Sequence, residues 1–141
     1  MRTKLSVVVA GLGLLAALAA KPVAAHHAFN AEFDPNRPVN FKGTVTKMLW
    51  VNPHVWIYVE VKKADGTVDE WMVEAGTPNT LLRRGLTKQS LLPGTQIIVD
   101  GYQSKDGSLR ANGRDLTLPS GQTLFLGSSG TGAPYDEKIK K

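Results

Sequence analysis

The amino-acid sequence predicts an all-β fold with one short helix, arranged as a small OB-fold-like barrel of five or six strands. Several short segments alternate apolar and polar residues, and turns rich in Gly, Pro and Asp separate them. Three of these strands precede a short helix and two or three follow it, which is the order of an OB-fold. An SH3-like barrel or another small β-sandwich remains the alternative, because hydrophobic periodicity does not separate these folds well.

Of the first three expected strands, the second and third form a hairpin. Residues 40–50 are rich in β-branched and aromatic residues, and Pro53 then interrupts the pattern because proline cannot donate to a sheet ladder. Residues 54–62 alternate well, so one face is aliphatic and the other carries polar and aromatic side chains. The aliphatic face holds Val55, Ile57, Val59 and Val61, and the other holds His54, Trp56, Tyr58 and Glu60. Asp65-Gly66 predicts the turn into the third strand, residues 68–75.

The expected helix and the last strands follow. Thr77 is a candidate N-cap, Pro78 suits the first helical position, and Gly85 closes the helix. Further strands are predicted at residues 95–103, 109–118 and 123–126. Gly113 lies in the middle of one of them and indicates a β-bulge.

Residues 1–25 are expected to be a secretory signal peptide. Two basic residues precede an uncharged run of 16, residues 5–20, which is shorter than the roughly 20 residues of a membrane-spanning helix. Val23 and Ala25 supply the small side chains that suit cleavage after Ala25. The mature chain would then begin at His26, in the bacterial periplasm or outside the cell, with no stable membrane span.

Composition favours one exported domain. Residues 26–126 are expected to form the barrel, and residues 127–141, which are Gly/Ser-rich and then charged, a disordered tail. Removing residues 1–25 also removes three of the 17 basic residues, so the net charge falls from +5 to +2 and argues against a nucleic-acid partner. The absence of cysteine excludes disulfides and thiolate chemistry. No catalytic triad, phosphate loop or dinucleotide motif is present, so a binding protein is expected rather than an enzyme.

Four short motifs occur together along the chain. They are HHAF (residues 26–29), NPH (52–54), PNTLLRRG (78–85) and DGSLRA (106–111). With the segments around them they resemble a bacterial family of small exported proteins that carries a domain-of-unknown-function label, DUF6152. The resemblance covers residues 26–125 and implies no activity, so the functional expectations rest on side-chain chemistry.

The three histidines, His26, His27 and His54, suggest a metal site. As the mature N-terminus, His26 would offer its α-amine and ring Nδ1 to one ion, and a second imidazole would complete a histidine brace. His54 is the expected second imidazole because it begins a strand beside a loop, and His27 competes for that role. Planar nitrogen coordination favours Cu(II), so copper is the expected cofactor and copper carriage, buffering or delivery the expected function.

Other interpretations stay open at the level of sequence. Adjacent histidines at a frayed terminus can be without function, and a strand histidine can simply bond a carbonyl. A second functional class is a binding module for an envelope protein, a peptide or a glycan, with Trp56, Tyr58 and Trp50 on the contact face. These aromatic residues can equally be buried. A copper oxidase or oxygenase is a third option, and it would need an open coordination position and a substrate groove.

Overall fold

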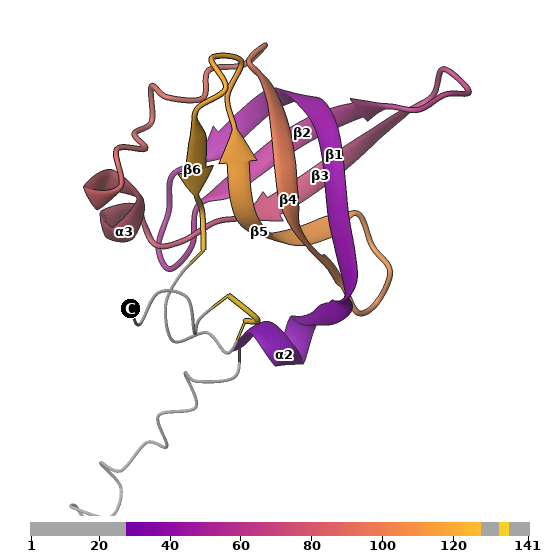
Figure 1. Ribbon diagram of the computed structural model, residues 1–141, viewed down its shortest axis with the longest axis horizontal. Coiled ribbons are helices and arrows are strands. Elements are labelled where there is room, and N and C mark those ends of the chain that lie inside the picture. The colour runs from indigo at the N-terminus through magenta and orange to yellow at the C-terminus, as the bar shows by residue number, and fades with distance from the viewer. Residues whose placement is uncertain (1–27, 128–132, 136–141) are drawn as a thin grey trace, which may run out of the picture.

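The computed structural model describes residues 28–127 and 133–135 of the chain (Figure 1). These residues form two short helices and six strands. In chain order they are α2 (Ala28–Glu32), β1 (Phe33–Leu49), β2 (Trp56–Lys62), β3 (Val68–Glu74), α3 (Pro78–Arg83), β4 (Gln96–Ser104), β5 (Arg110–Thr117) and β6 (Thr123–Phe125). The expected signal peptide, residues 1–25, lies outside the described residues.

The strands form one mostly antiparallel sheet whose two sides meet. Its order is β3-β2-β1-β4-β5-β6, and a parallel pairing of β3 with β5 brings the sheet round into a ring (Figure 1). The 17-residue strand β1 serves both halves, because Phe33–Thr44 pairs with β4 and Thr44–Leu49 pairs with β2. The prediction of a small all-β fold is confirmed, with α3 between the third and fourth strands.

The main core lies inside this ring. On β2 and the residue before it, Val55, Ile57 and Val59 are fully buried, as the alternation predicts. Gly43 lets β1 pass close to β2, because a Cβ at that position would lie 2.5 Å from Val59 Cγ1 and 2.6 Å from the Glu60 carbonyl oxygen. The buried members of the main core are Val45, Val55, Ile57, Val59, Val73, Ala75, Leu81, Leu86, Leu91, Ile97, Val99, Leu116 and Leu126.

Helix α3 and the later strands form as the sequence predicts. The Thr80 backbone N–H donates to Thr77 Oγ1 over 3.3 Å, Pro78 opens the helix, and Gly85 follows it with a φ of +87°. The predicted bulge is confirmed beside Gly113, where Arg114 is the extra residue: Asp100 pairs with Asp115 and Gly101 with Gly113. Strand limits agree with the sequence within two residues, except that β1 begins at Phe33 rather than at residue 40.

A second hydrophobic cluster lies between α2 and the C-terminal tail. We call it the second core; its residues are Phe29, Phe33, Ala133 and Tyr135, with Tyr102 and Phe125 packed against them. The sequence did not predict α2, because five residues are too few for a helix to be stable alone. Its stability comes from packing: Phe29 is 2% exposed, and its ring meets that of Tyr102 edge-on at 5.5 Å.

Three residues of the expected tail, 133–135, belong to the described part of the chain. Ala133 and Tyr135 are buried, and the Tyr135 hydroxyl donates to Asn112 Oδ1 over 2.5 Å. Burial of the ring with its hydroxyl bonded is favourable for a tyrosine. The Gly/Ser-rich composition around Tyr135 gives no sign of this packing. The rest of residues 128–141 lies outside the described part of the chain.

Candidate functional site

His54 lies in the loop between β1 and β2, two residues before β2 begins. The sequence predicted that the strand begins at His54, but in the structure it begins at Trp56. Main-chain pairing with the other strand of the hairpin nevertheless begins at Val55, just before β2. The Val55 N–H donates to Gly76 O over 3.1 Å, and the Ala75 N–H donates to Val55 O over 2.8 Å. These bonds fix the backbone next to His54, so the residue that carries the imidazole is held in place.

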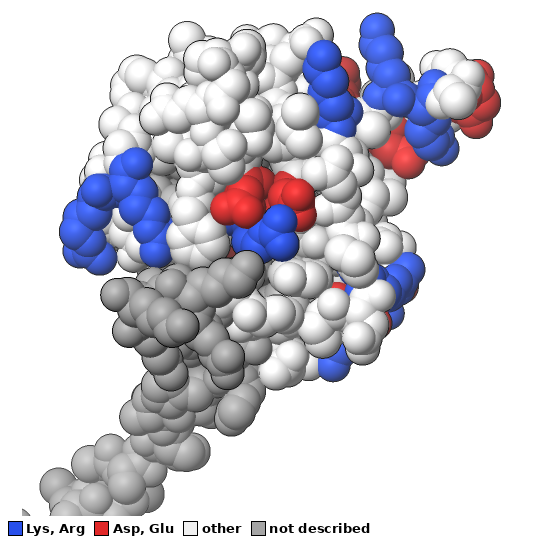
Figure 2. All heavy atoms as spheres, in the orientation of Figure 1, with Lys and Arg blue, Asp and Glu red and all other residues white. Residues whose placement is uncertain are grey.

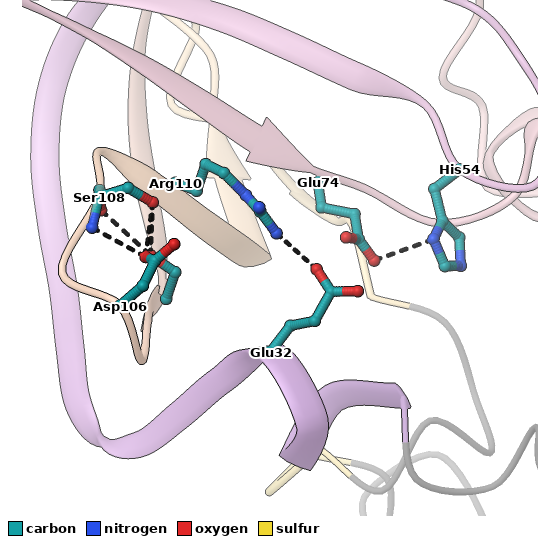
Figure 3. A network of polar contacts seen from close by, with 7 residues as sticks. Glu32, His54, Glu74, Asp106, Ser108 and Arg110 are labelled. Atoms are coloured by element: carbon teal, nitrogen blue, oxygen red, sulfur yellow. Dashed lines mark hydrogen bonds and ion pairs between the residues drawn. The ribbon is translucent and has the colours of Figure 1, made fainter.

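The imidazole of His54 is bound by the carboxylate of Glu74 (Figure 3). His54 Nδ1 lies 2.9 Å from Glu74 Oε1, with the two side chains 25% and 12% exposed. The register explains the contact: Glu74 is directly opposite Trp56 on β3, so it is the diagonal neighbour of the residue two positions before Trp56. The hairpin therefore positions this pair.

Glu74 determines the protonation of the ring. Its hydrogen bond is the largest cause that raises the pKa of His54; burial opposes it, and the charges of Glu74 and Glu32 add to the rise. Because Nδ1 donates to the carboxylate, the neutral ring carries its lone pair on Nε2. A carboxylate behind one ring nitrogen is the usual companion of a histidine whose other nitrogen binds a metal.

Helix α2 brings a second ion pair next to this one. Glu32, at the end of α2, binds Arg110 at the start of β5, and in Figure 3 Glu74 lies between His54 and this pair. The guanidinium carbon of Arg110 is 5.8 Å from the Phe33 ring and 5.9 Å from the Trp56 ring. Figure 3 shows the Glu32 carboxylate on the same side as that of Glu74, and its charge adds to the rise in the pKa of His54.

The β4–β5 turn borders the same region (Figure 3). Asp106 Oδ1 accepts hydrogen bonds from Ser104 Oγ, from the Ser108 N–H and from Ser108 Oγ, at 2.7, 2.9 and 2.7 Å. These bonds, together with the charge of Arg110, lower the pKa of Asp106 to about 2. The turn therefore has a fixed shape and a permanent negative charge at neutral pH.

The three aromatic candidates do not form one exposed surface. Trp56 and Tyr58 lie half-buried on β2, whereas Trp50 packs against the main core. Cations lie against the two outward rings: Arg110 against Trp56, and Lys47 Nζ at 4.2 Å from the Tyr58 ring centroid.

Only one of the three predicted metal ligands is described. His26 and His27 lie outside the described residues, two and one positions before α2. Within the described residues no group of three or more His, Asp or Glu side chains could hold a metal ion. His54 with Glu74 is thus a pair, and a complete site needs donors from elsewhere.

The sequence points to His54 but not to its neighbours Glu74 and Arg110. Counting the register back from the Asp65-Gly66 turn would have placed Glu74 beside His54, because Lys62 pairs with Val68 across that turn. Nothing local in the sequence indicates the Arg110 contact, since 78 positions separate it from Glu32.

Charges are mixed on the face drawn in Figure 2. Basic side chains lie beside acidic ones at the centre and the upper right of this face, and a group of basic side chains alone lies at the left, over α3. Arg114, for example, lies 2.9 Å from Asp100 and 2.8 Å from Asp115. In the described part of the chain, no helix is both long and apolar enough to span a bilayer.

Comparison with known proteins supplies a family. Searches of curated proteins and of solved structures find no significant match. A family model matches residues 14–113, which is most of the chain and includes His54, Glu74 and Arg110. The chain therefore belongs to the family of unknown function DUF6152.

Proposed function

We propose that this chain is exported to the periplasm or the exterior and binds copper as a carrier or buffer, with His26, His54 and, as an alternative donor, His27 as ligands. The observation that carries the proposal is the bond from His54 Nδ1 to Glu74 Oε1 at 2.9 Å. It leaves Nε2 as the basic nitrogen of a partly exposed ring, which is the preparation expected of a metal ligand.

The path of the chain supports the same proposal. Helix α2 begins two residues after His26, and its last residue, Glu32, is an electrostatic neighbour of His54. Covalent geometry limits two residues to a span of about 7 Å, so an amine at residue 26 starts within that distance of α2. The terminal amine, the His26 ring and His54 Nε2 would supply three nitrogen donors, and Cu(II) has the highest affinity of the common divalent ions for such donors.

Mass and metal content of the exported protein test the proposal directly. The full-length sequence is expressed for export, and the purified protein is weighed intact and titrated with Cu(II). We expect a mature mass that begins at His26 and one equivalent of tightly bound Cu(II), with an electron paramagnetic resonance (EPR) spectrum of nitrogen coordination. A mature chain that begins elsewhere, or one that retains no copper, would contradict the brace.

Substitution of the described pair tests the role of His54. His54→Ala should weaken Cu(II) binding more than tenfold, and Glu74→Gln by roughly 10–100-fold, the range for groups that orient a metal ligand. Glu70→Gln, an exposed carboxylate on the same strand, is the matched control and should bind as the wild type does. Unchanged affinity in His54→Ala, measured by competition with a chromophoric chelator, removes His54 from the site.

The runner-up is an envelope binding module that uses the outward face of β2. Trp56 and Tyr58 support it because they share the strand face by which OB-type folds bind ligands. Replacing both by alanine would abolish capture of a glycan or peptide in that case and leave copper uptake intact. Loss of copper binding in His54→Ala with intact capture would separate the two functions.

A further inference from the structure

The part of the chain around α3 carries positive charge without acidic residues to balance it. Residues 75–99 hold three basic residues, Arg83, Arg84 and Lys88, and neither aspartate nor glutamate. Figures 1 and 2 show the consequence, a group of basic side chains over α3 with no acidic side chain beside it in this view. The surplus of positive charge is therefore concentrated on one side of the domain.

Two of these three cations are available to a ligand. Arg83 and Lys88 are exposed, and neither forms an ion pair within the described residues. Arg84 is different, because its guanidinium donates to the carbonyl oxygen of Phe125 and its guanidinium carbon lies 4.6 Å from the ring centroid of that residue. Arg84 is thus held by the fold, whereas Arg83 and Lys88 carry their charge at the surface.

The same part of the chain exposes two leucines. Leu81, Leu86 and Leu91 belong to the main core, whereas Leu82 and Leu92, each directly after a buried leucine, are 49% and 57% exposed. Figure 1 shows this segment on the outside of the sheet, running from α3 to the start of β4. One exposed leucine is ordinary on a protein surface. Exposed leucines beside cations, in a segment without acidic residues, have the composition that peripheral proteins present to anionic lipid.

We infer that the α3 surface, defined as Leu82, Arg83, Lys88 and Leu92, binds the surface of a bilayer that contains anionic phospholipid. The cations attract the phosphate headgroups, and the leucine side chains enter the boundary of the acyl chains. An acidic protein would need two matching pockets at a fixed spacing for leucines that lie ten positions apart. Fluid lipid accepts each leucine where it lies. The inference goes beyond copper binding and uses none of the residues proposed as ligands.

The β2–β3 hairpin offers a matched control. Val68 is 49% exposed, as Leu82 is, and it pairs across the hairpin with the exposed Lys62. Acidic residues balance the cations here, since Lys63 Nζ lies 3.1 Å from Asp69 Oδ1. Lys62→Gln and Val68→Ser therefore remove one cation and one equally exposed apolar side chain from a region of mixed charge.

The test is sedimentation of the purified exported protein with lipid vesicles at low ionic strength. We expect binding to phosphatidylcholine vesicles that contain about one third phosphatidylglycerol, little binding to phosphatidylcholine alone, and loss of binding in about 1 M salt. Arg83→Gln and Lys88→Gln should each weaken partitioning about fivefold, the usual contribution of one cation near an anionic bilayer. Leu82→Ser should weaken it roughly fivefold through lost apolar contact. Arg83→Lys, which keeps the charge, should bind as the wild type does.

The variants share one N-terminus, so differences between them report the α3 surface. Equal binding to neutral and anionic vesicles overturns the inference, as does unchanged partitioning in Arg83→Gln and Lys88→Gln. Equal losses in Lys62→Gln and Val68→Ser also overturn it, because they would reflect the charge and apolarity of the whole surface. Binding to polyglutamate that exceeds binding to vesicles and does not change in Leu82→Ser assigns the surface to an acidic protein instead. Copper titration of the same variants is expected to be unchanged, so the two functions are tested separately.

Discussion

At the scale of single residues, the environment of a side chain decides its chemistry more than its type does. Glu74 and Glu70 occupy the same strand and face, yet only Glu74 meets the imidazole of His54 in the described residues. The sequence shows two equivalent glutamates four positions apart. What distinguishes them is the register of β3 against the loop before β2, which depends on the whole hairpin.

Asp106 gives a prediction of pH dependence at this scale. Its pKa is lowered from 3.8 to about 2, so its contribution to stability is full above the unfolded value and is lost as the pH falls through the folded value. Asp106→Asn should therefore be less stable than the wild type at pH 6, and the difference should shrink between pH 4 and pH 2. Urea unfolding at several pH values measures it, and a difference that does not depend on pH would contradict the assignment.

At the scale of elements, patterns carried by neighbouring residues were predictable and long-range packing was not. The alternation in β2, the turn at Asp65-Gly66 and the N-cap at Thr77 all reside in a few adjacent residues, and all three are confirmed. The early start of β1 and the existence of α2 depend on rings such as Tyr102 and on strand β4, far along the chain. The residues around β1 and α2 in the sequence therefore cannot indicate which distant residues they pack against.

The cap of α3 offers a prediction at this scale. Thr77 Oγ1 accepts the Thr80 N–H, which has no partner within the helix itself. Thr77→Ala should lower the free energy of unfolding by about 1 kcal/mol, the usual cost of losing such a cap. Thr77→Ser keeps the oxygen and should stay close to the wild type. Chemical denaturation of both variants checks this, and equal losses would show that the threonine methyl matters instead.

At the scale of the whole molecule, the two ends of the domain meet in the second core. Phe29 comes from the first described residues and Tyr135 from the last, and both lie next to Tyr102 of β4. The helix next to the proposed copper site is thus covered by a segment that the sequence assigns to a disordered tail. Because both segments are short and pack on the same ring of Tyr102, we expect their association with β4 to be cooperative.

This arrangement predicts that a change at the C-terminus loosens the N-terminal helix. Tyr135→Ala removes a ring that is 3% exposed and meets Phe125 edge-on at 5.3 Å, together with the bond to Asn112. Because truncating a buried aromatic side chain to alanine costs about 3–5 kcal/mol, docking of α2 should weaken well before the main core does. Hydrogen exchange should quicken in α2 and remain slow in β2 and β4, whereas Tyr58→Ala, on the outward face of β2, should leave α2 unchanged. Slow exchange in α2 of Tyr135→Ala would instead mean that Phe29 and the Glu32–Arg110 pair suffice to hold the helix.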